Sequence, residues 1–74
     1  MMNANRPLRI LGLDPGLRRT GWGVIGVAGS RITHIAHGVI APDEKAAFSD
    51  RLLTLFEGVC AVIEQHAPDE AAVE

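Results

Sequence analysis

A chain of 74 residues holds one small domain at most, and such a chain buries only ~60% of the surface that its unfolded form exposes. Hydrophobic residues make up 47% of the sequence, which is typical of a globular rather than a disordered protein. No apolar run approaches the ~18 residues that cross a membrane, and residues 1–9 lack the apolar centre of a signal peptide. We therefore expect a soluble, cytoplasmic protein, and its single cysteine excludes a disulfide framework.

The net charge of −2 is unevenly distributed along the chain. Residues 1–31 carry five arginines and one acid, whereas residues 32–74 carry eight acids and two basic residues. A basic half can contact the phosphates of a nucleic acid. The mildly acidic whole argues against a protein that coats nucleic acid, so charge alone does not decide the function.

The first predicted strand runs from Leu8 to Asp14, a short apolar run that ends in a carboxylate. A Pro15-Gly16 turn follows. Proline suits the second position of a turn and glycine the third, where a positive φ is often required. The chain is therefore expected to reverse direction immediately after Asp14.

Two further strands are predicted at residues 21–28 and 31–41, which are joined by a tight hairpin at residues 29–30. Three strands connected this closely should form an antiparallel meander. His34 and His37 are three apart on the third strand, so regular alternation places them on opposite faces, where they cannot share a metal ion.

The period of the apolar residues then becomes helical. The predicted sheet-facing stripe is centred on Leu52, Phe56, Val59 and Ile63. It is widened by four further apolar residues: Leu53, Leu55, Cys60 and Val62. Gly58 falls on the opposite face. The helix should begin between Asp43 and Ser49, where several side chains can cap it, and it should end before Pro68. Residues 69–74 then predict a fourth strand.

Strand order brings the first and last acids together. A right-handed crossover through the helix makes the fourth strand parallel to the first. If the two are neighbours, Asp14 and Glu74 both lie at carboxyl ends, outside which open α/β sheets bind their ligands. Two such carboxylates could hold Mg²⁺ ions ~3.5–4 Å apart, as in-line phosphoryl displacement requires. Each acid alone also has an ordinary explanation, as a turn residue or an exposed chain end.

The turn after Asp14 carries candidate phosphate ligands. Arg18 and Arg19 could hold a phosphodiester in two-pronged contacts. Thr20 and the neighbouring main-chain amides could surround an anion. Trp22 could stack on a base, although packing in the core is the stronger expectation.

Together these segments resemble a known family. Residues 10–16 (ILGLDPG), followed by residues 20–25 (TGWGVI), resemble the opening of the RuvC family of Holliday-junction resolvases. Residues 68–74 (PDEAAVE) resemble the family's fourth strand, which closes on its second catalytic acid. The intervening helix matches in length and position.

The resemblance implies an α/β, RNase H-like fold with a three-stranded antiparallel meander, a crossover helix and a parallel fourth strand. Asp14 and Glu74 would be the first two catalytic, metal-binding carboxylates. The activity would be that of a structure-specific endodeoxyribonuclease, which nicks four-way DNA junctions symmetrically in recombination and repair. It would use Mg²⁺, with Mn²⁺ as a substitute. The family acts as a homodimer together with a branch-migration motor.

The resemblance covers only the family's N-terminal half. Residues 1–7 would be a flexible N-terminus, and residues 8–74 would be the first part of a nuclease domain whose fold is truncated here. The remaining catalytic acids would lie on a late helix that this chain lacks. We therefore expect the chain alone to be inactive.

Three other readings stay open. Sugar kinases and Hsp70-type ATPases open with a similar hairpin that grips ATP phosphates, but Leu17 stands where their pattern usually has threonine. A YqgF-like nuclease of the same fold would act on RNA. A non-enzymatic module could bind a partner through the open edge of its sheet.

Overall fold

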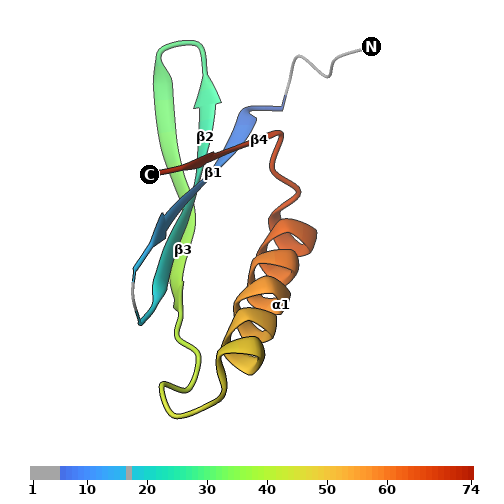
Figure 1. Cartoon of the computed structure of the whole chain (residues 1–74). Helices are drawn as coiled ribbons and strands as arrows, with labels where there is room; N and C mark the ends of the chain where they lie inside the picture. The colour runs from blue at the N-terminus through green and yellow to red at the C-terminus, as the bar shows by residue number, and fades with distance from the viewer. Residues whose placement is uncertain (1–5, 17) are drawn as a thin grey trace.

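The computed structural model describes residues 6–16 and 18–74 (Figure 1). The elements in chain order are β1 (Leu8–Pro15), β2 (Thr20–Ala28), β3 (Arg31–Ile40), α1 (Phe48–His66) and β4 (Glu70–Val73). Most of the predicted flexible segment, residues 1–7, lies outside the described residues. No helix in the described part of the chain is long and apolar enough to cross a membrane.

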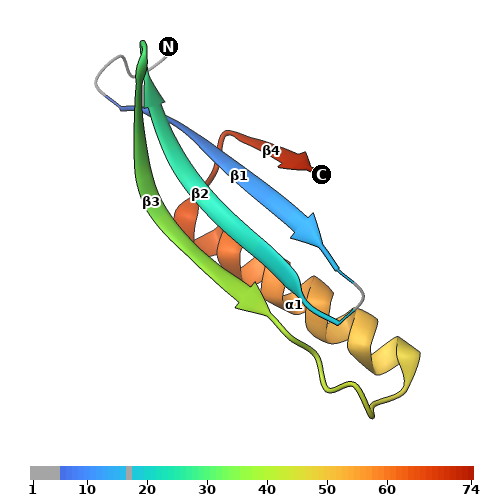
Figure 2. The same ribbon diagram turned by 90° about the vertical axis from the view of Figure 1, so that its left-hand side faces the viewer.

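The strands form one sheet in the order β3-β2-β1-β4 (Figure 2). β2 is antiparallel to both of its neighbours, and β4 lies parallel to β1. α1 runs along one face of the sheet and connects β3 to β4 (Figures 1 and 2). The predicted meander, crossover helix and parallel fourth strand are confirmed.

Two turns connect the antiparallel strands. Gly29 has a φ of 61° in the β2–β3 hairpin, which confirms the tight turn predicted there. In the β1–β2 turn, the Gly16 amide donates to the Arg19 carbonyl at 2.8 Å. The expected positive φ at Gly16 is wrong, because Gly29 is the only described glycine with one. Gly16 is required for space instead, since a Cβ there would lie 2.7 Å from the Arg19 oxygen.

β3 contains a bulge that the sequence pattern did not reveal. Val24 pairs with Ala36 and the next residue of β2, Ile25, pairs with His34, so Ile35 is left without a partner. An extra residue in one strand resets the alternation of its side chains. Residues three apart across this bulge therefore share a face of the sheet.

The core is small and lies between the sheet and α1. Its buried members are Leu11, Val24 and Val62. Leu13 and Trp22 are partly buried and pack against them. This confirms the expectation that Trp22 is a packing residue.

α1 meets the sheet along one side of the predicted stripe, where Leu55, Val59, Cys60 and Val62 are covered as expected. Its buried and half-buried residues are Arg51, Leu55, Gly58, Val59, Cys60, Val62 and His66. The predicted sheet-facing residues Leu52, Phe56 and Ile63 are 50%, 66% and 44% exposed. Gly58 explains the difference, because a Cβ there would come within 2.9 Å of Ile40 on β3. The missing side chain lets the helix approach closely at this point, which rotates its contact line.

Both ends of α1 lie where they were predicted, because the helix begins at Phe48, between residues 43 and 49, and ends at His66, before Pro68. The expected side-chain cap is absent, since the preceding Ala47 makes no side-chain capping bond. Asp43 closes a turn earlier in the loop, where its carboxylate accepts a bond from the main chain two residues later. At the other end, Ala67 has a left-handed φ of 45°, and its amide donates to the Ile63 carbonyl at 2.8 Å.

Ala67→Gly is expected to stabilise the protein by about 1 kcal/mol, because glycine adopts the left-handed conformation without the Cβ clash of alanine. Chemical denaturation followed by circular dichroism measures the change. Ala61→Gly, at an exposed position inside α1, is the matched control and should destabilise by roughly 0.5–1 kcal/mol. Destabilisation by both substitutions would contradict the account.

Candidate active site

Asp14 and Glu74 lie at the same edge of the sheet, at the carboxyl ends of neighbouring parallel strands. Leu13 pairs with Val73 in the β1–β4 ladder, and each acid is the next residue of its chain segment. The Glu74 amide donates to the Leu13 carbonyl at 3.1 Å. Both acids are exposed, and both line one hollow of about 390 Å³. The structure therefore brings together the two acids that strand order places side by side.

Three glycines form part of the wall of this hollow: Gly12, Gly21 and Gly23. A Cβ at Gly12 would meet nothing closer than 3.9 Å, and one at Gly21 would meet nothing within 4 Å. A residue with a side chain would therefore fit at either position without a clash. Glycine at these positions leaves the sheet surface beside the acids flat and open. Sequence reasoning missed this feature, whose signal is glycine at alternate positions on paired strands.

The charges at this edge fit a divalent cation. Neither acid belongs to an ion pair among the described residues, where the pairs are Arg6–Asp69 and Arg18–Glu44. Mg²⁺ is commonly held by one or two carboxylates and completes its shell with water and phosphate oxygens. In the described part of the chain, no group of three or more acidic, histidine or cysteine side chains could hold a metal ion. Asp14 and Glu74 are therefore the two acids at this edge that could hold such an ion together with water and phosphate oxygens.

Glu74 owes its position to a set of polar bonds at the other end of β4. Nη1 of Arg6 lies 3.0 and 3.2 Å from the two carboxylate oxygens of Asp69. The Arg9 amide donates to Asp69 Oδ2 at 2.8 Å, and the Asp69 amide donates to the Arg9 carbonyl at 2.8 Å. The two guanidinium groups also donate to the main-chain carbonyls of Ala67 and His66. These bonds attach the end of α1 and the start of β4 to β1.

The same bonds change the acidity of Asp69. The hydrogen bond from the Arg9 amide, and then the one from the Arg6 side chain, favour the ionised carboxylate and lower the pKa of Asp69 below its usual 3.8. Two of the five arginines in the basic half, Arg6 and Arg9, therefore bind groups within the protein. The sequence had indicated only that a basic half can contact phosphates.

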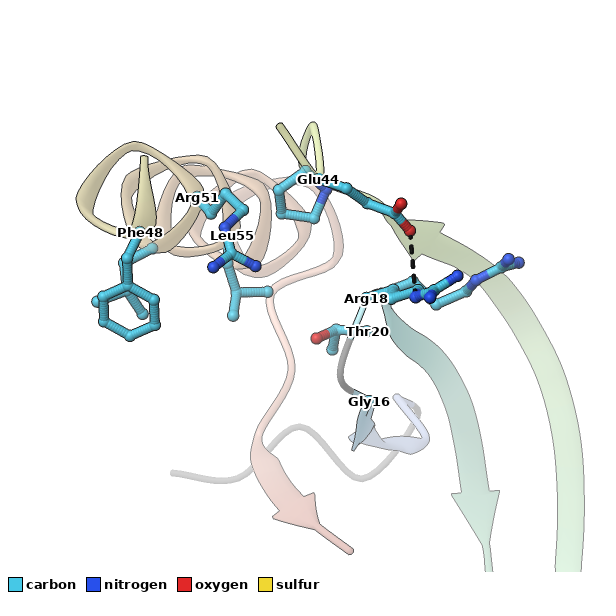
Figure 3. Close-up of a pocket in the computed structure, with 10 residues that line it drawn as sticks. Gly16, Arg18, Thr20, Glu44, Phe48, Arg51 and Leu55 are labelled. Carbon is cyan, nitrogen blue, oxygen red and sulfur yellow. Dashed lines mark ion pairs between the residues drawn. The ribbon is translucent and has the colours of Figure 1, made fainter. Parts of the chain in front are cut away.

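Arg18 and Arg19 line a second hollow of about 170 Å³, between the β1–β2 turn and the start of α1 (Figure 3). Arg18 Nε lies 3.4 Å from Glu44 Oε1, and both side chains are mostly exposed. An exposed pair of this kind contributes little to stability. The Arg18 guanidinium is therefore available to a competing anion such as a phosphate.

The two hollows open on opposite faces of the sheet. Thr20 lines the second hollow and is only 5% exposed, on the face that α1 covers. The next residue, Gly21, pairs with Asp14 and points to the uncovered face. The predicted phosphate ligands and the predicted metal ligands thus lie at the same end of the sheet but do not share one cavity.

Arg51 is a residue of the second hollow that sequence reasoning missed. Its Nε is buried and has no hydrogen-bond partner among residues 6–16 and 18–74. Its guanidinium carbon lies 5.6 Å from the centre of the Phe48 ring, a distance suited to a cation–π contact. The sequence contains one indication of this position. Arg51 lies four residues before Leu55, so both residues lie on the same side of the helix, which the structure shows to be covered.

The histidines also differ from prediction. His34 and His37 were expected on opposite faces, and this is wrong, because the bulge at Ile35 places both on one face. His34 Nε2 and His37 Nδ1 are 2.9 Å apart. His66 stands apart from them at the end of α1, where its ring packs 5.5 Å from the Trp22 ring.

Comparison with known proteins identifies relatives of the chain. A sequence model of the family described as crossover junction endodeoxyribonuclease RuvC matches residues 10–74. A curated relative of that description from Caulobacter vibrioides is 83% identical over 75 residues, which span all of this chain and 44% of the relative. A second, from a Caulobacter species, is 76% identical with the same coverage. The chain spans less than half the length of these relatives.

Solved structures agree on the fold. A structure of T. thermophilus RuvC in complex with Holliday junction substrate matches with a TM-score of 0.81 at 24% identity, over 89% of this chain and 41% of that chain. This likeness confirms the RNase H-like arrangement. The Aquifex aeolicus PPX-GPPA enzyme matches with a TM-score of 0.66 at 10% identity, over 89% of this chain and 25% of that one. Because differently named proteins share this fold, the fold alone does not determine activity.

Asp69→Asn is expected to lower stability at neutral pH and to remove part of the stability loss in acid. The pKa of Asp69 is lower in the folded than in the unfolded chain. Its contribution is therefore complete above the unfolded value and is lost as the pH falls through the folded value. Urea midpoints at pH 7 and between about pH 5 and pH 2 measure both effects.

Glu70→Gln is the control, since Glu70 is an exposed acid one residue further along the chain. If the Asp69 and Glu70 variants lose stability in acid to the same degree as the unaltered protein, Asp69 does not hold β4 as described.

Proposed function

The chain belongs to the crossover junction endodeoxyribonuclease RuvC family, and on that basis we propose that it forms the N-terminal part of a metal-dependent endonuclease that nicks four-way DNA junctions. The observation that carries the proposal is the meeting of Asp14 and Glu74 in one open hollow. Family membership favours this reading over an ATP-binding domain of the sugar-kinase or Hsp70 type and over a YqgF-like RNA nuclease.

Asp14 and Glu74 are the proposed metal ligands and catalytic residues. Their carboxylates would hold Mg²⁺, with Mn²⁺ as a substitute, and the ion when bound supplies an activated water and charge stabilisation for phosphodiester hydrolysis. The role of Gly12 and Gly21 is to let a sugar–phosphate strand lie close to the sheet beside the acids. Each missing side chain removes an obstacle at the point where the scissile phosphate must reach the carboxylates.

Arg18 and Arg19 are the proposed phosphate contacts next to this site. The exposed pairing of Arg18 with Glu44 gives way to a DNA phosphate at little cost. Thr20 was a third candidate, but its 5% exposure leaves little surface for DNA. We assign Thr20 to holding the turn that presents the two arginines.

The proposed partners are four-way junction DNA, a second copy of the protein and a branch-migration motor. The T. thermophilus RuvC structure contains Holliday junction substrate, which supports the first. Symmetrical nicks at a two-fold junction require two equivalent active sites, which a homodimer with C₂ symmetry supplies.

Asp14→Asn should abolish junction cleavage and preserve junction binding, because it removes a metal-binding charge with little change of shape. The test protein joins residues 1–74 to the remainder of the Caulobacter vibrioides relative, whose matching part is 83% identical. Cleavage of a labelled junction with Mg²⁺ should fall at least about a hundredfold, as when an active site loses a group that stabilises transition-state charge. Glu74→Gln should behave alike.

Asp43→Asn, an exposed acid in the loop before α1, is the matched control and should leave both cleavage and binding unchanged. Gel-shift assays without Mg²⁺ measure binding separately. Simultaneous loss of binding and cleavage in the Asp14 variant would assign Asp14 a folding role instead.

The 74-residue chain by itself should show no junction cleavage with either Mg²⁺ or Mn²⁺. Its described residues contain no metal-binding cluster larger than a pair of acids. The same assay compares the chain with the fused protein at equal concentration. Robust cutting by the chain alone would contradict the proposal that further ligands are required.

A further inference from the structure

The bulge in β3 creates a feature that the junction-cutting activity does not use. It places His34 and His37 on the uncovered face of the sheet, with His34 Nε2 and His37 Nδ1 2.9 Å apart and the ring centres 5.0 Å apart. Both residues are exposed. Two imidazoles whose nitrogens lie this close can chelate one metal ion when both nitrogens are unprotonated and the rings turn so that both lone pairs point to an ion beside the line that joins them.

The spacing of the two nitrogens fits a class of ion. Metal–nitrogen bonds to histidine are about 2.0–2.1 Å. Two nitrogens 2.9 Å apart therefore subtend an angle of roughly 90° at an ion bound to both. That angle is found in the tetragonal geometry of Cu²⁺ and Ni²⁺, ions for which imidazole is a suitable ligand. Mg²⁺ prefers oxygen ligands.

The surroundings leave room for an ion and its remaining water ligands. His37 pairs with Gly23 on β2, which has no side chain, and a Cβ built there would meet nothing closer than 3.9 Å. Exposed imidazoles can rotate at the small cost of a surface side chain. Among the described residues, both imidazoles are exposed and are not packed against a neighbour that an ion would displace.

We propose that His34 and His37 form a two-histidine binding site for a divalent transition metal ion of the Cu²⁺ and Ni²⁺ class, separate from Asp14 and Glu74. The site depends on the extra residue Ile35, because without it the two rings would point to opposite sides of the strand. It is a property of this chain's own residues and does not rest on the proposed nuclease activity.

The test is a calorimetric titration of the 74-residue chain, and of the fused protein, with Ni²⁺ in the presence of excess Mg²⁺. One equivalent of Ni²⁺ should bind. His34→Gln and His37→Gln should each weaken binding at least about tenfold, since loss of even an indirect support of a metal ligand costs that much. Asp14→Asn should leave Ni²⁺ binding unchanged, which separates this site from the proposed nuclease site.

A matched variant keeps the number of histidines and changes only their spacing. Ile32→His combined with His34→Gln moves one imidazole to a position that is 68% exposed on the same strand. It then lies five residues from His37, too far along the strand for both rings to reach one ion. Ni²⁺ binding should fall as far as in His34→Gln, while circular dichroism shows the fold intact. Wild-type affinity in this variant or in both single variants would overturn the proposal.

Discussion

The attachment of β4 to β1 is the constraint on which the rest of the site depends. All four residues of β4 are exposed, so burial of apolar surface does little to keep the strand in place. Its position rests on the parallel ladder with β1 and on the bonds of Asp69 to Arg6 and Arg9. Hydrogen bonds to charged groups are stronger than neutral ones, although solvent weakens them at an exposed site such as this one. The polar bonds of Asp69 at the start of β4 thus help to position the Glu74 carboxylate that follows the end of β4.

The two faces of the sheet carry different kinds of residues. The face toward α1 holds the small core, in which Leu11 and Val24 are fully buried, and ends in the arginine-lined hollow beside Arg51. The opposite face carries the acids, the glycines beside them and the histidine pair. In the described residues this second face has no helix over it. The alternation of side chains along β1 and β2 keeps the structural and chemical groups apart.

Features that depend on neighbouring residues were predicted from the sequence, whereas features that depend on contacts between distant segments were not. Neighbouring residues indicate the chain reversal after β1 and the hairpin at Gly29, although the first turn lies at residues 16–19 with Pro15 still in β1. Topology rules then place β4 beside β1. The bulge at Ile35 depends on pairing with another strand, which no pattern within β3 records. The rotation of α1 depends on Gly58 meeting β3. The Asp69 bonds join residues about 60 positions apart in the chain, beyond the reach of any motif.

The proposed metal site and the attachment of β4 are linked through charge. Asp14 and Glu74 bring two negative charges to one hollow without a cationic partner among the described residues, and like charges at close range oppose each other. Glu74 directly continues β4, a strand that has little buried surface to hold it in place. A divalent ion held by both carboxylates would connect the ends of β1 and β4. By mass action, an ion that binds only the docked arrangement stabilises it, so the chemistry proposed for this edge also strengthens the strand that creates it.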